Sequence, residues 1–343
     1  MSFYRPLNIA SLSLPGNLFL APVAGYSDRA FRSLCVEQGA DFTYTELISA
    51  EALARLPQSG GEARSAPPLR RGPGETYRAI QLFGANPDSI YRAALRLASF
   101  HPDAVDINSG CPVHKVVKTG AGAALMRNPA LLARIVEAAV RASAEALGGV
   151  PVTVKMRSGW DSDSLNYREA ASACQEAGAA MIALHPRTRA QGYSGKSEWS
   201  LIADMASRLK IPSAGSGDLF APDDAERMLR ETGCAAVMFA RGALGNPFIF
   251  AAARAFLLGE TWEPPSLEDR LAAAFRHLLM LAEDLGERRA CLEMRKQFCA
   301  YTKGRSLIPG GPQPALRIAR LRERLVHAAS IEDYRVILEE YET

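Results

Sequence analysis

The sequence is poor in features that mark several classes of protein. No C-x-x-C pair or neighbouring histidine cluster accompanies its six cysteines, which argues against a zinc site or a disulfide framework. The longest apolar run near the N-terminus, 18–24, is interrupted by Pro22 and is too short to span a membrane. We therefore expect reduced thiols, no bound metal, no membrane association and a cytoplasmic location.

The chain also lacks a strong charge bias. Its 40 Lys and Arg residues against 37 Asp and Glu residues give a net charge of +3, too small to require a polyanionic partner if spread evenly. With 48% apolar and 22% charged residues, the composition excludes disorder and fibrous repeats. At roughly 150 residues per domain, 343 residues predict about two domains, although α/β barrels often exceed 200 residues.

Short apolar runs that suit buried parallel strands recur from the N-terminus. They cover 18–24, 40–46, 77–83, 104–109, 150–156, 179–185, 211–215 and 235–240. Helix-like segments separate them, and Asn86-Pro87, Asn128-Pro129 and Asn246-Pro247 predict helix starts, because Asn caps free N–H groups and Pro suits the first turn. Ala221-Pro222 is a weaker version. Without G-x-G-x-x-G after the first run, a closed (β/α)8 TIM barrel is favoured over an open doubly wound sheet.

After Leu258 the pattern changes to helices only, which predicts a barrel domain over 1–258 and a small all-helical domain over 259–343. Ten basic and three acidic residues lie between Gly286 and Arg324, so positive charge is concentrated there. A solvated helical face is one interpretation. Phe298 and Tyr301 beside Arg295 and Lys296 indicate the other, an RNA-binding surface that combines cations with stacking rings.

Polar residues gather where the predicted barrel strands end, which is where sites in such barrels lie. The fourth strand runs into Asn108-Ser109-Gly110-Cys111-Pro112, which places a thiol at the mouth with His114, Lys115 and Lys118 nearby. A reactive or proton-donating Cys111 and an inert small side chain are both compatible with this pattern. Lys155, Arg157, His185, Arg187 and Arg189 follow the next two strands, a set of cations that suggests an anionic ligand.

The remaining strand ends outline the shape of a ligand. Gly215-Ser216-Gly217-Asp218 and Ala240-Arg241-Gly242 follow the last two strands, where barrels often bind phosphate through backbone N–H groups. The Pro22–Ala24 backbone offers a flat wall, and the Gln81 amide offers a donor and an acceptor for a ring edge. A cavity with flat, amide-lined and phosphate-binding ends suits flavin mononucleotide (FMN).

These motifs together resemble the tRNA-dihydrouridine synthase family, and most closely its bacterial B-type members, over nearly the whole chain. The resemblance rests on 20–29, Gln81–Gly84, Asn108–Pro112, 154–160 and 185–191, with Asn-x-Gly-Cys-Pro in register with the Lys155 and His185 segments as the specific signal. Ser216 and Ala240 depart from the family's usual Asn and Gly. Met294–Phe298 resembles the basic stretch of the family's C-terminal domain.

The resemblance implies a function and a set of roles. NADPH would reduce FMN, hydride would pass to C6 of a uracil ring in tRNA, and Cys111 would protonate C5. The implied cofactor contacts are Pro22, Val23, Ala24, Gln81, Lys155, His185, Ser216, Gly217, Asp218, Ala240 and Arg241. The implied substrate contacts are Asn108, Arg187, Arg295 and Lys296. The modified uridine, the oligomeric state and the choice of NADPH over NADH are not readable from the sequence.

Two alternatives remain open at this stage. One is a barrel flavoenzyme that acts on a small molecule, similar to a dihydroorotate dehydrogenase, which would not need a basic helical appendage. The other is a non-catalytic RNA-binding protein that keeps the barrel as a scaffold.

Overall fold

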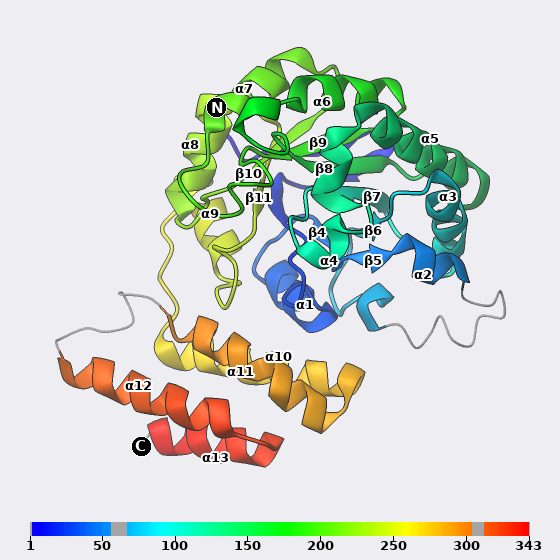
Figure 1. Ribbon diagram of the computed structural model, residues 1–343. Helices are drawn as coiled ribbons and strands as arrows, with labels where there is room; N and C mark the ends of the chain where they lie inside the picture. The colour runs from blue at the N-terminus through cyan, green and yellow to red at the C-terminus, as the bar shows by residue number, and fades with distance from the viewer. Residues whose placement is uncertain (1, 56–66, 304–311, 343) are drawn as a thin grey trace.

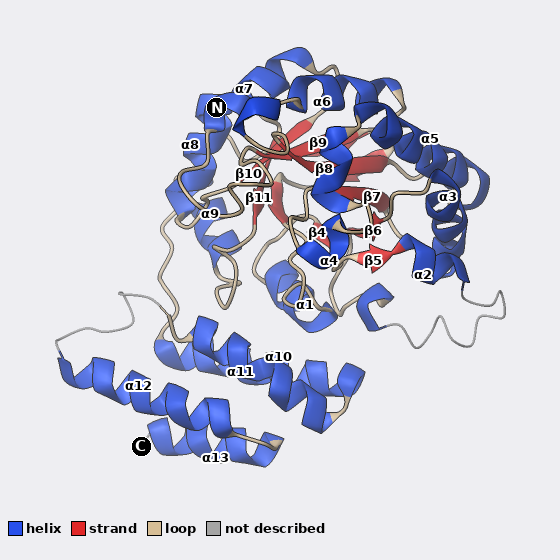
Figure 2. Ribbon diagram, viewed as in Figure 1, coloured by secondary structure: helices blue, strands red, loops and turns tan. Residues whose placement is uncertain are grey.

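The structure is a computed structural model that describes residues 2–55, 67–303 and 312–342. Its centre is a barrel of eight parallel strands surrounded by helices (Figures 1 and 2). In chain order these are β3 (Leu18–Leu20), β4 (Thr43–Tyr44), β6 (Arg78–Phe83), β7 (Ala104–Ser109), β8 (Val152–Arg157), β9 (Met181–His185), β10 (Ser213–Ser216) and β11 (Ala236–Phe239). All eight lie in or overlap the predicted apolar runs, so the predicted TIM barrel is confirmed.

The barrel is closed by backbone contacts between its first two strands. The path of paired strands runs β3-β11-β10-β9-β8-β7-β6-β4. Leu20 N–H then donates to the Phe42 carbonyl at 2.9 Å, and Asp41 N–H donates to the Leu18 carbonyl at 2.8 Å. Because all strands are parallel, their carboxyl ends meet at one rim, as the sequence analysis requires.

The sequence analysis missed three short strands. β1 (Leu7–Ile9) and β2 (Leu12–Leu14) form an antiparallel hairpin, and β5 (Ile48–Ser49) pairs with the end of β6. Ile9 and Leu14 of the hairpin pack in one buried cluster with strand residues such as Phe19 and Met181. The hairpin therefore belongs to the barrel's interior core.

Helices cover the outside of the barrel and continue as a separate group at the C-terminus. The barrel helices are α1 (Arg29–Glu37), α2 (Ala50–Arg55), α3 (Pro87–Arg96), α4 (His114–Val117), α5 (Pro129–Ala146), α6 (Tyr167–Glu176), α7 (Trp199–Arg208), α8 (Pro222–Thr232) and α9 (Ile249–Leu258). The C-terminal helices, here called the helical region, are α10 (Leu267–Leu285), α11 (Glu287–Tyr301), α12 (Pro312–His327) and α13 (Ile331–Glu342). Short 3₁₀ helices occur at Pro67–Leu69, Leu97–Phe100, Gly122–Arg127 and Ser162–Ser164.

Two of the three predicted Asn caps are present. The Asn86 side chain accepts from the N–H groups of Asp88 and Ser89 at the start of α3, and Asn128 caps α5. The third prediction was wrong: α9 begins at Ile249, because residues 241–248 form turns before the helix starts. The weaker signal at Ala221-Pro222 does start α8.

The helical region packs on the barrel through α1 and through the turns before α9. Ala30 and Leu34 of α1 belong to the same buried cluster as Leu278 and Phe298 of the helical region. Arg29 forms an ion pair with Asp284 of α10 at 2.7 Å. The two parts therefore share a packed junction, with α10 and α11 nearest the barrel and α12 and α13 farther away (Figure 1).

The turn before α9 leaves no room at the junction. Gly245 has a φ of +63°, and a Cβ there would lie 2.3 Å from the backbone of Ala300 and Tyr301. The Gly245 carbonyl also accepts a hydrogen bond of 3.2 Å from Arg270 of α10. Glycine is required because the conformation is left-handed and another segment of backbone lies against it.

Candidate active site

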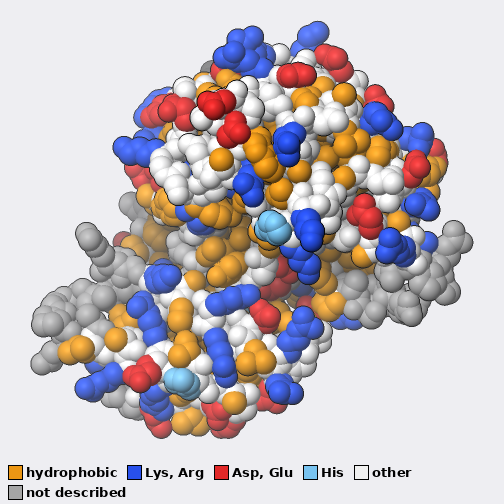
Figure 3. Space-filling view, in the orientation of Figure 1, with side chains coloured by type: hydrophobic (Ala, Val, Ile, Leu, Met, Phe, Trp, Pro, Cys, Tyr) orange, Lys and Arg blue, Asp and Glu red, His pale blue; other side chains and the backbone are white. Residues whose placement is uncertain are grey.

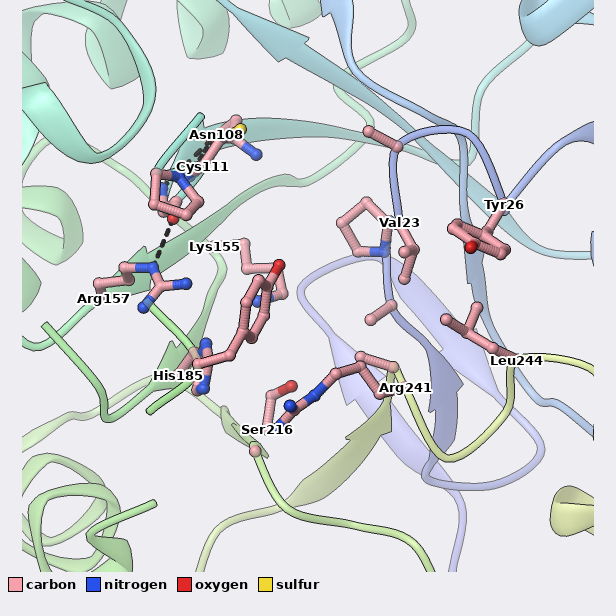
Figure 4. A pocket seen from close by; sticks show the side chains of 18 of the residues that line it. Val23, Tyr26, Asn108, Cys111, Lys155, Arg157, His185, Ser216, Arg241 and Leu244 are labelled. Atoms are coloured by element: carbon pink, nitrogen blue, oxygen red, sulfur yellow. Dashed lines mark hydrogen bonds between the residues drawn. The ribbon is translucent and has the colours of Figure 1, made fainter. Parts of the chain in front are cut away.

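A cavity of about 350 Å³ opens at the carboxyl ends of the strands. In Figure 4, Asn108, Cys111 and Lys155 face Val23, Tyr26 and Leu244 across this space, with His185, Ser216 and Arg241 along a third side. The predicted residues that line it are Pro22, Val23, Ala24, Asn108, Cys111, Lys155, His185, Ser216, Gly217, Asp218, Ala240 and Arg241. The structure thus brings together residues from widely separated motifs.

Gln81 and Arg187 are not among the residues that line the cavity. Gln81 is fully buried, donates to Asp106 at 2.6 Å and accepts from Asn108 at 2.8 Å. Arg187 is 2% exposed, and its guanidinium forms a two-bond ion pair of 3.0 and 2.8 Å with Asp218. Both side chains instead bond to residues that line the cavity, Gln81 to Asn108 and Arg187 to Asp218.

The Cys111 loop is held by hydrogen bonds to its backbone. The Asn108 side-chain oxygen accepts from the N–H groups of Gly110 at 3.2 Å and Cys111 at 2.9 Å. On the other side, Arg157 Nε donates to the Gly110 carbonyl at 2.7 Å, the contact drawn in Figure 4. Burial raises the pKa of the Cys111 thiol, so the sulfur carries its proton at neutral pH. Cys111 therefore presents a protonated thiol at the wall of the cavity.

Burial lowers the pKa of three basic groups that line the cavity. Burial, with the neighbouring Arg157, lowers the pKa of Lys155 to about 8. Burial also lowers the pKa of Arg157 to about 10. For His185, burial followed by the charge of Lys155 and nearby guanidinium groups lowers the pKa to about 2. Lys155 and Arg157 are consequently cations at neutral pH, whereas His185 is a neutral imidazole that can only exchange hydrogen bonds.

The loops after β10 and β11 form a tight corner of the cavity. A Cβ at Gly217 would lie 2.2 Å from Ser197 Oγ, so only glycine allows this approach. Asp218 has a φ of +55°, a conformation that Asp tolerates, and its carboxylate accepts from Arg187 and, at 2.9 Å, from Arg241. The Ser216 hydroxyl donates to the Met238 carbonyl at 3.0 Å, so its hydrogen bond goes to the barrel wall.

The sequence analysis missed two aromatic residues at the cavity mouth. Tyr193 and Phe220 line the cavity although they are 58% and 52% exposed. The Arg241 guanidinium lies 4.9 Å from the centre of the Tyr193 ring and 5.2 Å from that of Phe220. Both rings come from loops without strand or helix periodicity, so the only available signal was their position shortly after a strand end.

The donor set of the cavity fits a flat anionic ligand. Lys155, Arg157 and Arg241 bring three positive charges to the lining, and Asp218 brings the one carboxylate there. That carboxylate already accepts from two guanidinium groups. Uncompensated buried cations are costly unless a ligand neutralises them. The volume lies in the range of small-molecule sites, and the cations and the glycine-lined corner fit the phosphate of FMN.

The family model described as dihydrouridine synthase (Dus) matches residues 19–313, which include the helices α10 and α11 and the barrel strands except for Leu18. The chain belongs to the dihydrouridine synthase family. A probable tRNA-dihydrouridine synthase from Treponema pallidum is 46% identical, and the match covers 98% of this chain and 96% of the relative. tRNA-dihydrouridine synthase B from Pseudomonas aeruginosa is 33% identical, with coverage of 96% and 95%. The predicted family resemblance is confirmed.

Solved structures with a similar fold include a morphinone reductase and an old yellow enzyme homologue. Morphinone reductase in complex with tetrahydroNAD has a TM-score of 0.52 at 16% identity, covering 79% of this chain and 94% of that one. An old yellow enzyme homologue from Zymomonas mobilis has a TM-score of 0.51 at 12% identity, with coverage of 79% and 96%. At these identities the similarity establishes the barrel fold of this dihydrouridine synthase family member.

The predicted nucleic-acid face of this family member needs a correction. Phe298 and Tyr301 are fully buried, and Phe298 stacks on Tyr334 of α13 with ring centres 4.7 Å apart. Neither ring can therefore stack on a base. They are buried because Met294, Phe298 and Tyr301 recur at helical spacing on the core side of α11.

The two predicted basic contacts of α11 lie outside the cavity and differ in direction. Arg295 donates weakly to the Ala328 carbonyl at 3.4 Å within the helical region. Lys296 instead reaches the barrel, where its ammonium lies 5.2 Å from the centre of the Tyr26 ring, a residue of the cavity lining. Figure 3 shows other Lys and Arg side chains spread over the visible face of the helical region. Arg305 lies outside the described residues.

Membrane spans and metal sites are both absent from the part of the chain that the structure describes. Within residues 2–55, 67–303 and 312–342, no helix has the length and apolar character to cross a membrane. Over the same ranges, no group of three or more His, Cys, Asp or Glu side chains has the arrangement of a metal site.

Proposed function

We propose that this protein reduces the C5–C6 double bond of uridine in tRNA to give dihydrouridine, with FMN as cofactor and NADPH as reductant. The observation that carries the proposal is the meeting of a protonated Cys111 thiol with an excess of cations in one cavity of a dihydrouridine synthase family member. The free cysteines and the tRNA substrate of its named relatives favour a cytoplasmic setting.

We assign the cofactor's phosphate to the corner formed by Gly217, Ala240 and Arg241. The Arg241 guanidinium would contribute positive charge there. Asp218 would not contact the phosphate, because its carboxylate repels it, and would instead orient Arg241 through their hydrogen bond. The flat Pro22–Ala24 wall would pack against the ring system, with Lys155 and His185 opposite. Ser216 would contribute backbone contacts alone, since its hydroxyl is bonded to Met238.

The chain's own residues would supply the proton and the charge stabilisation. When bound, FMN supplies the hydride that adds to C6 of the uracil ring. The Cys111 thiol then gives its proton to C5, and the raised pKa keeps that proton in place until it is needed. Negative charge develops on the uracil oxygens as hydride arrives, and the ammonium of Lys155 would stabilise it in a cavity with little water.

Two further residues would orient the substrate. Neutral His185 would take part as a hydrogen-bond partner, because its lowered pKa leaves no proton to transfer as an acid. Asn108 keeps one side-chain N–H beyond its bond to Gln81, and this group would contact a uracil oxygen. Arg157 and Tyr193, which face the same space, would border the uracil.

We assign catalysis to a barrel domain, 1–258, and tRNA binding to the helical domain, 259–343. The target uridine must leave its stack to reach the cavity, at a cost of about a few kcal/mol. Phosphate contacts from exposed Lys and Arg side chains would offset that cost. Lys296, which reaches Tyr26 at the cavity lining, would mark the path between the two parts.

The test is direct. Purified protein should be yellow, should oxidise NADPH faster when an unmodified tRNA transcript is added, and should leave dihydrouridine in that transcript by nucleoside mass spectrometry. A yellow protein that reduces a small pyrimidine but no tRNA would favour the small-molecule flavoenzyme. A colourless protein that binds tRNA would favour the RNA-binding scaffold.

A further inference from the structure

A directed row of hydrogen bonds lies beneath the Cys111 loop. It begins at the buried carboxylate of Asp106 on β7, which accepts from Gln81 Nε2 at 2.6 Å. Gln81 Oε1 accepts from Asn108 Nδ2 at 2.8 Å. Asn108 Oδ1 in turn accepts from the N–H groups of Gly110 and Cys111. The row therefore links the barrel interior to the residue that carries the thiol.

Both ends of this row have fixed chemistry. The backbone N–H groups of Gly110 and Cys111 can only donate. The Asp106 oxygen that faces Gln81 accepts, and it has no amide alternative. Two amides placed between a fixed acceptor and fixed donors satisfy every bond in one orientation only. If Gln81 turned over, two oxygens would meet at Asp106, and if Asn108 turned over, its NH₂ would meet the backbone N–H groups.

We propose that Asp106 is a positioning residue for Cys111: its carboxylate sets the orientation of Gln81 and Asn108, which hold the loop that presents the thiol. The role of the thiol as proton donor rests on the proposed function, whereas the positioning of the loop does not. Asp106 is buried and does not line the cavity, and it acts through the other two side chains.

The surroundings of Asp106 agree with this role. Its second oxygen accepts from the Thr153 hydroxyl at 2.5 Å, and the side chain is 1% exposed. Burial raises the pKa of Asp106 to about 7. A proton on the oxygen that faces Thr153 still leaves the other oxygen as the acceptor for Gln81, so the orientation of the row is the same in both protonation states.

The test uses variants that break the row and then restore it. Gln81→Glu places two acceptors against each other at Asp106 and is expected to release Asn108. In the double variant Asp106→Asn/Gln81→Glu, the amide introduced at position 106 donates to the carboxylate introduced at position 81. That carboxylate still accepts from Asn108, and the net charge equals that of the wild type. Asp106→Asn alone removes the fixed acceptor, because its amide can turn either its oxygen or its NH₂ toward Gln81.

The readout that a general loss of packing would not reproduce is amide hydrogen exchange over residues 109–113, measured on the purified holoenzyme. Gln81→Glu should speed exchange there on the order of tenfold, and the double variant should restore the wild-type rate. Asp106→Asn should exchange at a rate between those of the wild type and Gln81→Glu. The turnover number for dihydrouridine should follow the same order with KM for tRNA unchanged.

The outcomes separate this inference from the proposed function. Faster exchange in Gln81→Glu that returns to the wild-type rate in the double variant supports positioning, even in a protein that makes no dihydrouridine. Folding of the double variant where Gln81→Glu alone does not fold is the same rescue. Equal exchange in Gln81→Glu and the double variant, unaltered exchange in Gln81→Glu, or failure of both to fold overturns the inference.

Discussion

Two cations of the cavity and two of the helical region differ in how their charge is balanced. Among the described residues, Lys155 and Arg157 of the cavity lie in no ion pair with a carboxylate, and both are shielded from solvent. In the helical region, Lys296 pairs with Glu293 at 2.6 Å and Arg324 pairs with Glu340 at 2.5 Å, at positions 38–54% exposed.

This difference predicts how each part responds to substitution. Unpaired charge in a low-dielectric cavity is costly. A ligand that neutralises this charge therefore binds more tightly, and its affinity depends little on the salt concentration. Exposed pairs contribute about 0–1 kcal/mol and are screened by salt. Substitutions in the cavity should therefore have large, salt-independent effects, and those in the helical region small, salt-dependent ones.

The largest expected effect is that of Cys111→Ala. Loss of the proton donor should slow dihydrouridine formation by about 10²- to 10⁴-fold, the usual contribution of a positioned acid. FMN content and reduction by NADPH should be unchanged, which stopped-flow absorbance measures. Cys299→Ala on α11, outside the cavity, is the matched control. Undiminished product from Cys111→Ala would remove the thiol from the reaction.

The next effect is on cofactor affinity. Arg241→Ala should weaken FMN binding about tenfold to a hundredfold, because one charge-assisted hydrogen bond to phosphate is lost. Flavin fluorescence titration of the apoprotein measures this. Arg227→Ala, which removes an exposed guanidinium paired with Asp224 on α8, should bind FMN as the wild type does. Equal losses in the two variants would argue against a phosphate site at Arg241.

A smaller effect is expected from pH. Because the pKa of Lys155 is lowered to about 8, its charge is present below pH 8 and is lost as the pH rises above that value. FMN affinity of the apoprotein should thus fall by up to about tenfold between pH 7 and pH 9. Lys155→Arg should abolish that fall, since guanidinium stays charged. A flat profile in the wild type would contradict the assignment.

The smallest effect is expected in the helical region. Lys296→Glu should weaken tRNA binding a few-fold at low salt and reduce the slope of log affinity against log salt by about 1, leaving FMN content intact. Lys210→Glu, on the barrel after α7, is the control for net charge. An unchanged slope would show that Lys296 is an ordinary solvated residue. Arg295→Glu is a poorer test, because Arg295 faces the Ala328 carbonyl.

Much of the barrel was predictable because buried parallel strands leave continuous apolar runs, and because their polar ends must share a rim. The strand containing Val105 and Ile107 and the Cys111 loop after it were both found in this way. The β1–β2 hairpin was not, since its strands of three residues are shorter than the roughly four or more residues over which alternation can be recognised. Asn246 was misread because the chain turns before it becomes helical.

The errors at the site have a different cause. Tyr193 and Phe220 reach the cavity through loop conformations that no periodicity encodes. The sequence also did not indicate that Gln81 bonds to Asp106, because a strand residue has a choice of neighbours that the sequence does not rank; its predicted contact with the cofactor stays a prediction. Phe298 and Tyr301 could have been placed correctly, because with Met294 their spacing follows the apolar side of a helix.

The contact between Gly245 and the Ala300–Tyr301 backbone has a consequence for substrate choice. Leu244, next to Gly245 in the chain, lines the cavity. The helical region, which would hold a tRNA, is therefore joined directly to the cavity wall. The distance between the helical region and the cavity is then fixed by this junction. Altering that distance should change which nucleotide of the tRNA reaches the cavity, while leaving the reduction step unchanged.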